Sequence, residues 1–193
     1  FQTSFNPDII LPSKWGVKMP LKLNMSSSIK TPKYYPNQPD ILTASDNQSI
    51  PDSIKTINRT VSLSSSFNKT TKSDNWLVKS TIDPLSLSLS TIQKDNSSVT
   101  IRENKVMNTD LGINYSYSFN RDNYFRPFKS FEKMLFFGKA LSETKIYYSP
   151  EKISSSMNIS ESQENKEMRT GIATDTYNLG MNRSYVLNYK ITD

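Results

Sequence analysis

Aspartate and glutamate are the residues that could do acid–base or metal chemistry in this chain, because its 193 residues include neither cysteine nor histidine. Those two absences exclude disulfides, zinc fingers, thiolate nucleophiles, Ser-His-Asp triads and imidazole bases, and they leave only oxygen ligands for a metal site. The best-spaced carboxylates are Glu161, Glu164 and Glu167, which would share one face of a helix. Nothing beside them indicates a catalytic acid or a cation cage, so we interpret residues 160–176 as a solvated loop. We expect no enzyme activity, no metal and no cofactor.

Phosphate and nucleic-acid binding are not indicated either. The chain has five glycines and contains neither a GxxxxGK nor a GxGxxG motif. Its net charge is +6, from 24 Lys and Arg against 18 Asp and Glu, but the basic residues are scattered among acids and form no stripe. We therefore expect no nucleic-acid partner.

Composition sets the chain apart from an ordinary soluble domain. The sequence contains 30 Ser, 18 Asn and 16 Thr, and only 35% of its residues are hydrophobic. Disorder is one interpretation of such a composition, but the 9 Phe, 10 Tyr and 2 Trp are more aromatic residues than a disordered chain usually has. No apolar run approaches the 18 residues of a transmembrane helix, a length that a barrel strand does not need.

Apolar residues recur at every second position. From Trp15 to Met25 every odd-numbered residue is apolar, which is the period of a strand with one apolar face. The last two runs of this kind share parity and would form one long strand interrupted at Arg183. Seven runs are strong, and no helical period of comparable length occurs. The other six runs cover residues 61–67, 85–89, 111–119, 153–159, 177–181 and 185–191.

The composition of the polar positions favours a membrane barrel over a soluble sheet. A β-sandwich normally exposes many Lys, Glu and Arg within its strands, whereas these positions are mostly Ser, Asn, Thr and Gly. Runs of about ten residues with aromatic residues toward their ends fit the strands and aromatic girdles of an outer-membrane barrel. We therefore predict an all-β fold, an antiparallel transmembrane β-barrel segment with long loops.

This prediction divides the strand residues into two sets. The residues predicted to face lipid are Trp15, Val17, Met19, Leu21, Leu23, Met25, Val61, Leu63, Phe67, Leu85, Leu87, Leu89, Leu111, Ile113, Tyr115, Tyr117, Phe119, Tyr177, Leu179 and Met181. The residues predicted to face the lumen are Lys18, Lys22, Asn24, Ser62, Ser64, Ser86, Ser88, Asn114, Ser116, Ser118, Asn178 and Asn182.

Four segments between the runs have their own signals. Residues 28–56 are rich in proline, which predicts a long extended loop. Residues 94–108 carry a turn signal and predict a protruding hairpin. We expect a strand to begin at Trp76. Residues 122–142 form an apolar insertion in which Phe131, Met134 and Leu135 have helical spacing and Gly138 would cap a short helix; it either packs on itself or contacts a partner or plug. The candidate contact residues are Arg126, Pro127, Phe128, Phe131 and Phe137.

The sequence resembles the SprA/Sov family, the outer-membrane translocon of the type nine secretion system, which is also tied to gliding motility. The resemblance rests on ordered motifs, each short, that span nearly the whole chain. They are Leu11-Pro-Ser-Lys-Trp-Gly16, Met19-Pro20, Thr31-Pro-Lys-Tyr34, Pro39-Asp40, Asn75-Trp76, Leu111-Gly-Ile-Asn-Tyr-Ser-Tyr117, Phe125-Arg-Pro-Phe-Lys129, Tyr147-Tyr-Ser-Pro150 and Asn182-Arg-Ser-Tyr185. Residues 161–167 match none of the family's motifs.

The resemblance implies a function and a setting. Residues 1–193 would be part of a longer chain whose barrel is of the largest known class, roughly 36 strands, so that about seven strands make a fifth of its wall. That barrel would pass folded cargo proteins across the outer membrane of a Gram-negative bacterium, with a periplasmic plug and a smaller cargo-accepting barrel protein as partners. The alternatives are another outer-membrane barrel, such as a porin or receptor, and a secreted β-sandwich or solenoid that binds as an adhesin does. About seven strands would not close a small barrel, which has an even strand number and no open edge.

Overall fold

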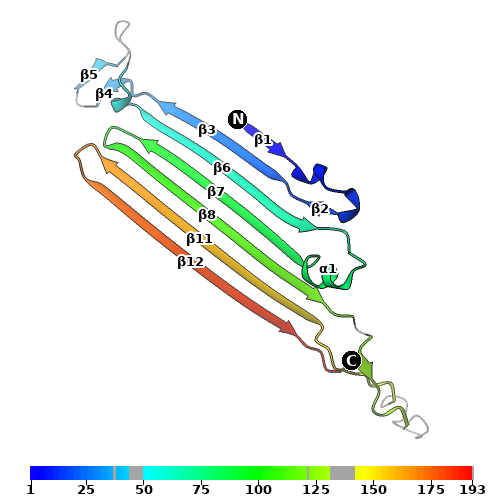
Figure 1. The fold of residues 1–193 in the computed structure, drawn as a ribbon. Helices are drawn as coiled ribbons and strands as arrows, with labels where there is room; N and C mark the ends of the chain where they lie inside the picture. Colours follow the sequence, from blue (N-terminus) through cyan, green and yellow to red (C-terminus); the bar gives the residue numbers. More distant parts are fainter. Residues whose placement is uncertain (37, 44–49, 121, 131–141, 193) are drawn as a thin grey trace.

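A single antiparallel sheet forms most of the molecule. The computed structural model describes residues 1–193 apart from 37, 44–49, 121, 131–141 and 193. The sheet has eight strands in the order β1-β3-β6-β7-β8-β11-β12, with β2 paired to β6, so neighbours in space follow one another along the chain. Because β1 and β12 lie at opposite edges and do not pair, the sheet is open and not closed into a barrel (Figure 1).

The strands of the sheet are β1 (Gln2–Phe5), β2 (Val17–Lys18), β3 (Leu21–Lys30), β6 (Thr56–Lys69), β7 (Leu85–Ser97), β8 (Ile101–Ser118), β11 (Lys152–Met168) and β12 (Ala173–Asn188). The last five of these strands are longer than the apolar alternation predicted. Two small two-stranded sheets lie outside this sheet. One pairs β4 (Tyr34–Tyr35) with β5 (Gln38–Leu42), and the other pairs β9 (Tyr124–Phe125) with β10 (Ile146–Tyr147). The helical elements are α1 (Trp76–Thr81) and the 3₁₀ turns Pro7–Ile10, Ser13–Trp15 and Asp52–Ile54.

The two ends of the sheet differ in their connections. At one end, which we call the hairpin end, β7 turns into β8 and β11 into β12 within a few residues (Figure 1). Gly171 has φ +85° in the second turn, a conformation that a side chain would strain. The opposite end, the α1 end, carries α1 and the connection from β8 to β11. The tight turn between β7 and β8 at the hairpin end confirms the hairpin predicted within residues 94–108.

Three sequence predictions are wrong, each for a local reason. Trp15 lies in a 3₁₀ turn, not in a strand, because Gly16 at φ +60° ends that turn and Pro20 separates β2 from β3. Trp76 begins a helix, because the Asn75 side chain caps it by accepting a hydrogen bond from the Leu77 N–H at 3.0 Å. Residues 160–176, interpreted as a loop, belong mainly to β11 and β12.

Two other expectations are refined. The last two apolar runs form the single strand β12, which continues through Arg183 without a break and ends at Asn188. The proline-rich segment 28–56 begins in β3, ends in β6 and contains the β4–β5 hairpin. The helical spacing at Phe131, Met134, Leu135 and Gly138 lies outside the described residues.

An ion pair ties down the connection between β6 and β7. Lys69 Nζ lies 2.5 Å from Asp83 Oδ1, and both side chains are less than a tenth exposed. Asp83 also accepts the Ser73 N–H at 2.6 Å. Burial raises the pKa of Asp83, but the hydrogen bonds from Lys69 and Ser73 outweigh it and hold the pKa below its usual value.

The sheet encloses no hydrophobic core. Tyr147, at 9% exposure, is the one buried hydrophobic side chain among the described residues, and no side chain there is completely buried. The chain exposes 14418 Å², whereas a compact monomer of 22.1 kDa exposes about 9,300 Å². One layer of strands with no second layer packed on it accounts for that excess surface.

Loss of the Asp83 carboxylate should loosen the α1 end. We expect Asp83→Ala to lower the free energy of unfolding by about 2 kcal/mol, because Lys69 loses its charged partner and the Ser73 N–H its acceptor. Urea unfolding in the buffer or detergent where the chain folds measures this. Because the pKa of Asp83 is depressed, its contribution is present above about pH 4 and is lost as the pH falls through the folded-state value. Asp52→Ala is the control: Asp52 pairs with Lys55 but is 78% exposed, so the midpoint should not move. Equal effects of the two substitutions would contradict the stabilising role of the Lys69–Asp83 pair.

Candidate functional site

Register divides the sheet into two faces by residue number. In an antiparallel sheet, directly paired residues share a face. Odd-numbered residues pair with odd-numbered ones from β3 to β12, as in Leu23 with Leu63 and Leu111 with Ile159, and even-numbered residues pair likewise, apart from Met168 with Ile101 beyond a register shift. We call the two surfaces the odd face and the even face.

The odd face carries the large apolar side chains and leaves many of them in contact with solvent. Its apolar zone extends over all the long strands from the row of Leu89, Leu111 and Ile159 to the α1 end, with Ser65, Lys69, Ser155 and Arg183 as polar interruptions. Toward the hairpin end, apolar residues continue on this face of β3, β6 and β12, whereas polar ones follow on the strands between them: Thr91, Gln93, Thr109, Glu161 and Gln163. The exposed large apolar residues of this face are Met25, Ile29, Val61, Leu63, Leu89, Met107, Ile153, Tyr177, Leu179, Met181, Tyr185 and Leu187. Monomeric soluble proteins rarely expose so many large apolar side chains on one face.

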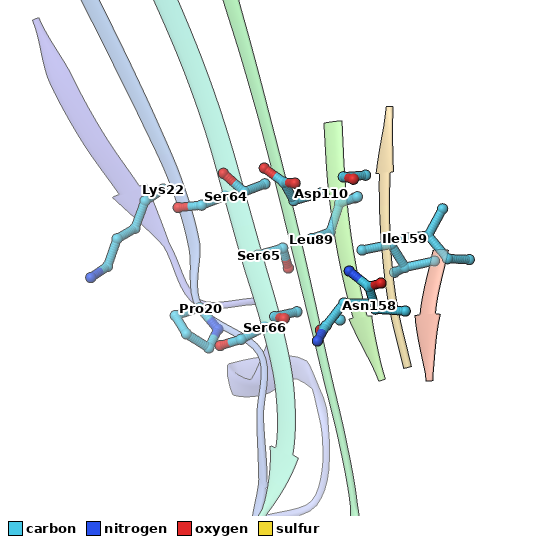
Figure 2. A pocket seen from close by; sticks show the side chains of 15 residues that line it. Pro20, Lys22, Ser64, Ser65, Ser66, Leu89, Asp110, Asn158 and Ile159 are labelled. Atoms are coloured by element: carbon cyan, nitrogen blue, oxygen red, sulfur yellow. The ribbon is translucent and has the colours of Figure 1, made fainter. Parts of the chain in front are cut away.

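The even face is built of small polar side chains. Ser64, Ser90 and Ser160 lie in one row across the sheet, with Lys22 and Asp110 as the charged members of that row. A shallow hollow of about 530 Å³ follows this row over β3, β6, β7, β8 and β11 (Figure 2). The hollow exists because the side chains around it are short.

Gly112 leaves room on the same face for side chains of the neighbouring strands. A Cβ atom at position 112 would lie 2.5 Å from Ser88 Oγ and 3.3 Å from Asn158 Oδ1. Gly180, further along the face, would place its Cβ 3.0 Å from Ser160 Oγ. Side chains of the neighbouring strands therefore occupy the space that these glycines leave.

Most residues of the two predicted sets lie together on one face each. All twelve residues predicted to line the lumen are even-numbered members of sheet strands. Of the residues predicted to face lipid, all lie on the odd face except Trp15 in its turn, Met19 between β2 and β3, and Phe119 just beyond β8. Phe119 still stacks edge-on against Tyr117, with ring centroids 4.9 Å apart.

The described candidate contact residues of the insertion lie beyond the α1 end of the sheet. Arg126 stands over the Tyr124 ring at 5.7 Å, and Tyr124 packs against Tyr147 at 5.8 Å. Pro127 and Phe128 follow in a turn, with Phe128 partly exposed. Phe131 and Phe137 lie outside the described residues.

The apolar alternation does not reveal the polar end of β11 and the polar start of β12. Toward the hairpin end most residues on both faces of β7, β8 and β11 are polar, so the alternation no longer shows in the sequence. Charges there pair with one another: Arg102 contacts Glu167 at 2.8 Å and Lys105 contacts Glu103 at 2.6 Å. The signal that would have revealed the second hairpin is its short turn at Gly171, which fixes the register of residues on both sides, as the turn signal did for β7 and β8.

On β12 the apolar run of the odd face has the height of a bilayer core, whereas on β7 and β11 it ends sooner, at Leu89 and Ile159. From Tyr177 to Leu187 the odd face of β12 runs for ten residue steps, about 33 Å at 3.3 Å per residue. A strand tilted by about 40° spans about 25 Å over that length, the height of the apolar band of an outer-membrane barrel. Both tryptophans, Trp15 at 54% exposure and Trp76 at 71%, lie at the α1 end.

No protein-family model matches the chain, and no curated protein matches it significantly. Within the described residues no helix has the length and hydropathy needed to cross a membrane. The same part of the chain holds no group of three or more Asp or Glu residues placed to bind a metal ion. The site that the geometry offers is therefore the pair of faces itself.

The fit between Gly112 and its neighbours can be tested by a double-mutant cycle. We expect Gly112→Val to destabilise the sheet by about 1–3 kcal/mol, because the new Cβ meets Ser88 Oγ. Ser88→Ala removes that oxygen and should restore part of the loss, which unfolding midpoints of the single and double variants will show. Strictly additive effects would mean that the two positions do not touch.

Proposed function

We propose that this chain is a wall segment of an outer-membrane β-barrel, with the odd face toward lipid and the even face toward a water-filled lumen. One observation carries the proposal: a one-layer sheet has an apolar zone across all its long strands on one side, which reaches bilayer height on β12, and small polar side chains on the other. Water would leave the odd face unstabilised, whereas lipid removes that surface from water. A porin or receptor wall would share these features.

Within that class, the resemblance to SprA/Sov proteins favours a protein-conducting translocon that exports folded cargo by type nine secretion. A lumen lined by Ser, Asn and Gly offers hydrogen bonds with little charge, which suits a conduit that must not retain its cargo. The proposed partners are the rest of the barrel, outer-membrane lipid, the cargo proteins, a cargo-accepting barrel protein and a periplasmic plug. The chain has no catalytic role in this proposal, and its location is the outer membrane of a Gram-negative bacterium.

A pair of arginine substitutions on neighbouring residues of β7 tests the orientation of the two faces. Leu89 lies on the odd face in a row with Leu111 and Ile159, and Ser90 lies on the even face in register with Asp110. We expect Leu89→Arg to cost about 2–4 kcal/mol in a bilayer, since the guanidinium would enter lipid. Ser90→Arg should be tolerated, because the lumen holds water and Asp110 is adjacent. Folding titrations in lipid vesicles measure both, and equal costs would refute the assignment.

Tryptophan depth gives an independent test. Tryptophan gathers at membrane–water interfaces, so Trp15 and Trp76 should both lie near the headgroups. In the single-tryptophan variants Trp15→Phe and Trp76→Phe, we expect lipids brominated near the glycerol to quench fluorescence more than lipids brominated at the chain ends. Unquenched, fully water-exposed emission from both variants would show that the α1 end does not meet a bilayer.

A further inference from the structure

Arg183 is the one charged residue in the apolar run of β12 from Tyr177 to Leu187; on the same face, β11 places Glu161 opposite Leu179, four residues from Arg183 along β12. Arg183 ends a row whose other members are Phe67, Leu87, Ile113 and Met157. Its Nε and Nη2 lie 3.0 and 2.9 Å from the Met181 sulfur, a weak acceptor that cannot satisfy a guanidinium. No ion pair with a carboxylate reaches Arg183 within the described part of the chain.

The position of Arg183 along β12 places it away from both ends of the apolar run. Leu187, the nearer end, is four residues on, which corresponds to about 10 Å of depth at 3.3 Å per residue and a tilt of about 40°. A guanidinium at that depth is among the least favourable groups that a lipid-facing strand can carry. A lipid phosphate lies at the headgroups, so the depth favours a protein partner.

Among the described residues, no strand pairs with the outer edge of β12 along its 16 residues. It carries two charged residues, Asp175 and Arg183, and no proline, so it lacks the usual protection of an edge strand. The Phe119 N–H donates to the Glu151 carbonyl, so the odd-numbered residues on the β11 side of this ladder bond to β8. The Met168 N–H donates to the Ile172 carbonyl, so the even-numbered residues of β11 bond to the even-numbered residues of the neighbouring strand. The even-numbered residues of β12 therefore bond to β11, and odd-numbered ones, Arg183 included, direct their N–H and C=O groups to the open edge.

We propose that β12 receives an antiparallel strand of the same wall, and that this strand places an aspartate or glutamate directly opposite Arg183 on the odd face. Directly opposed residues have Cβ atoms about 5 Å apart, within reach of a bidentate guanidinium–carboxylate pair. The new strand satisfies the open backbone groups, and its carboxylate satisfies the charge. This inference rests on the proposed function and adds the chemistry of the missing neighbour.

Zero-length cross-linking identifies the partner. In outer membranes of cells that make the protein, Arg183→Lys presents an amine that a carbodiimide will join only to a carboxylate in contact with it. We expect mass spectrometry to find the introduced lysine joined to an Asp or Glu of one peptide outside residues 1–193, at about ten times the yield of the control Asn182→Lys. The control residue is adjacent but lies on the even face. Absence of a link, equal yields, or a link to Glu161 of the neighbouring strand would overturn the proposal.

Arg183→Leu separates the same alternatives by the sign of its effect. If a carboxylate faces Arg183, this substitution leaves that carboxylate unpaired and lowers the folded fraction in membranes about tenfold or more. If Arg183 meets lipid tails alone, the substitution raises the folded fraction, and the proposal fails. If the partner is an anionic lipid headgroup, the loss appears in anionic phosphatidylglycerol vesicles and vanishes in zwitterionic phosphatidylcholine vesicles, which also overturns the proposal. Tryptophan quenching by brominated lipids reports separately on whether the chain inserts into the bilayer. If the fluorescence is quenched but Arg183→Lys gives no cross-link, this inference alone is refuted. If the fluorescence is not quenched, the proposed function is refuted.

Discussion

Removal of the odd face from water is the condition on which the rest of this structure depends. Hydrogen bonds between strands satisfy the backbone of a one-layer sheet, but they contribute little net stability because water competes for the same groups. Burial of apolar side chains normally supplies the remainder, and here almost none is buried within the chain. The sheet therefore needs a surrounding medium or partner that takes up its apolar zone, and a bilayer would meet that need for all its long strands at once.

Register and side-chain size follow from the same condition. A slip of one residue would exchange the two faces, so long ladders with few irregularities fix the pairing of Leu111 with Ile159 and of Ser88 with Gly112. On the even face, small side chains keep neighbouring strands close without filling the space above them. Gly112 is the clearest case, since the side chains of Ser88 and Asn158 already occupy the place of its Cβ. The same faces would suit any wide conduit, so the proposal that the cargo is folded protein comes from the resemblance.

The part of the fold that sequence could predict is the part where one face is apolar. The period of two located β6, β7, β8, β11 and β12 and assigned their side chains to faces, because parity is a local property. It missed the polar strand ends, where Glu161, Glu164 and Glu167 alternate with other polar residues and no contrast remains. It also took Trp76 for a strand residue, because the cap by Asn75 depends on one side-chain hydrogen bond that the apolar pattern does not reveal. The isolation of Arg183 required the row of neighbours that only the paired sheet supplies.

Cysteine accessibility along β8 tests the central claim most directly, and the natural absence of cysteine makes every introduced thiol unique. Single cysteines at Leu111 and at each position from Ile113 to Ser118, placed in the protein in lipid vesicles, would be treated with a water-soluble maleimide. We expect labelling with a period of two: positions 114, 116 and 118 react, and positions 111, 113, 115 and 117 stay protected until detergent dissolves the bilayer. Uniform labelling of all seven positions, or protection of the even-numbered ones, would contradict it.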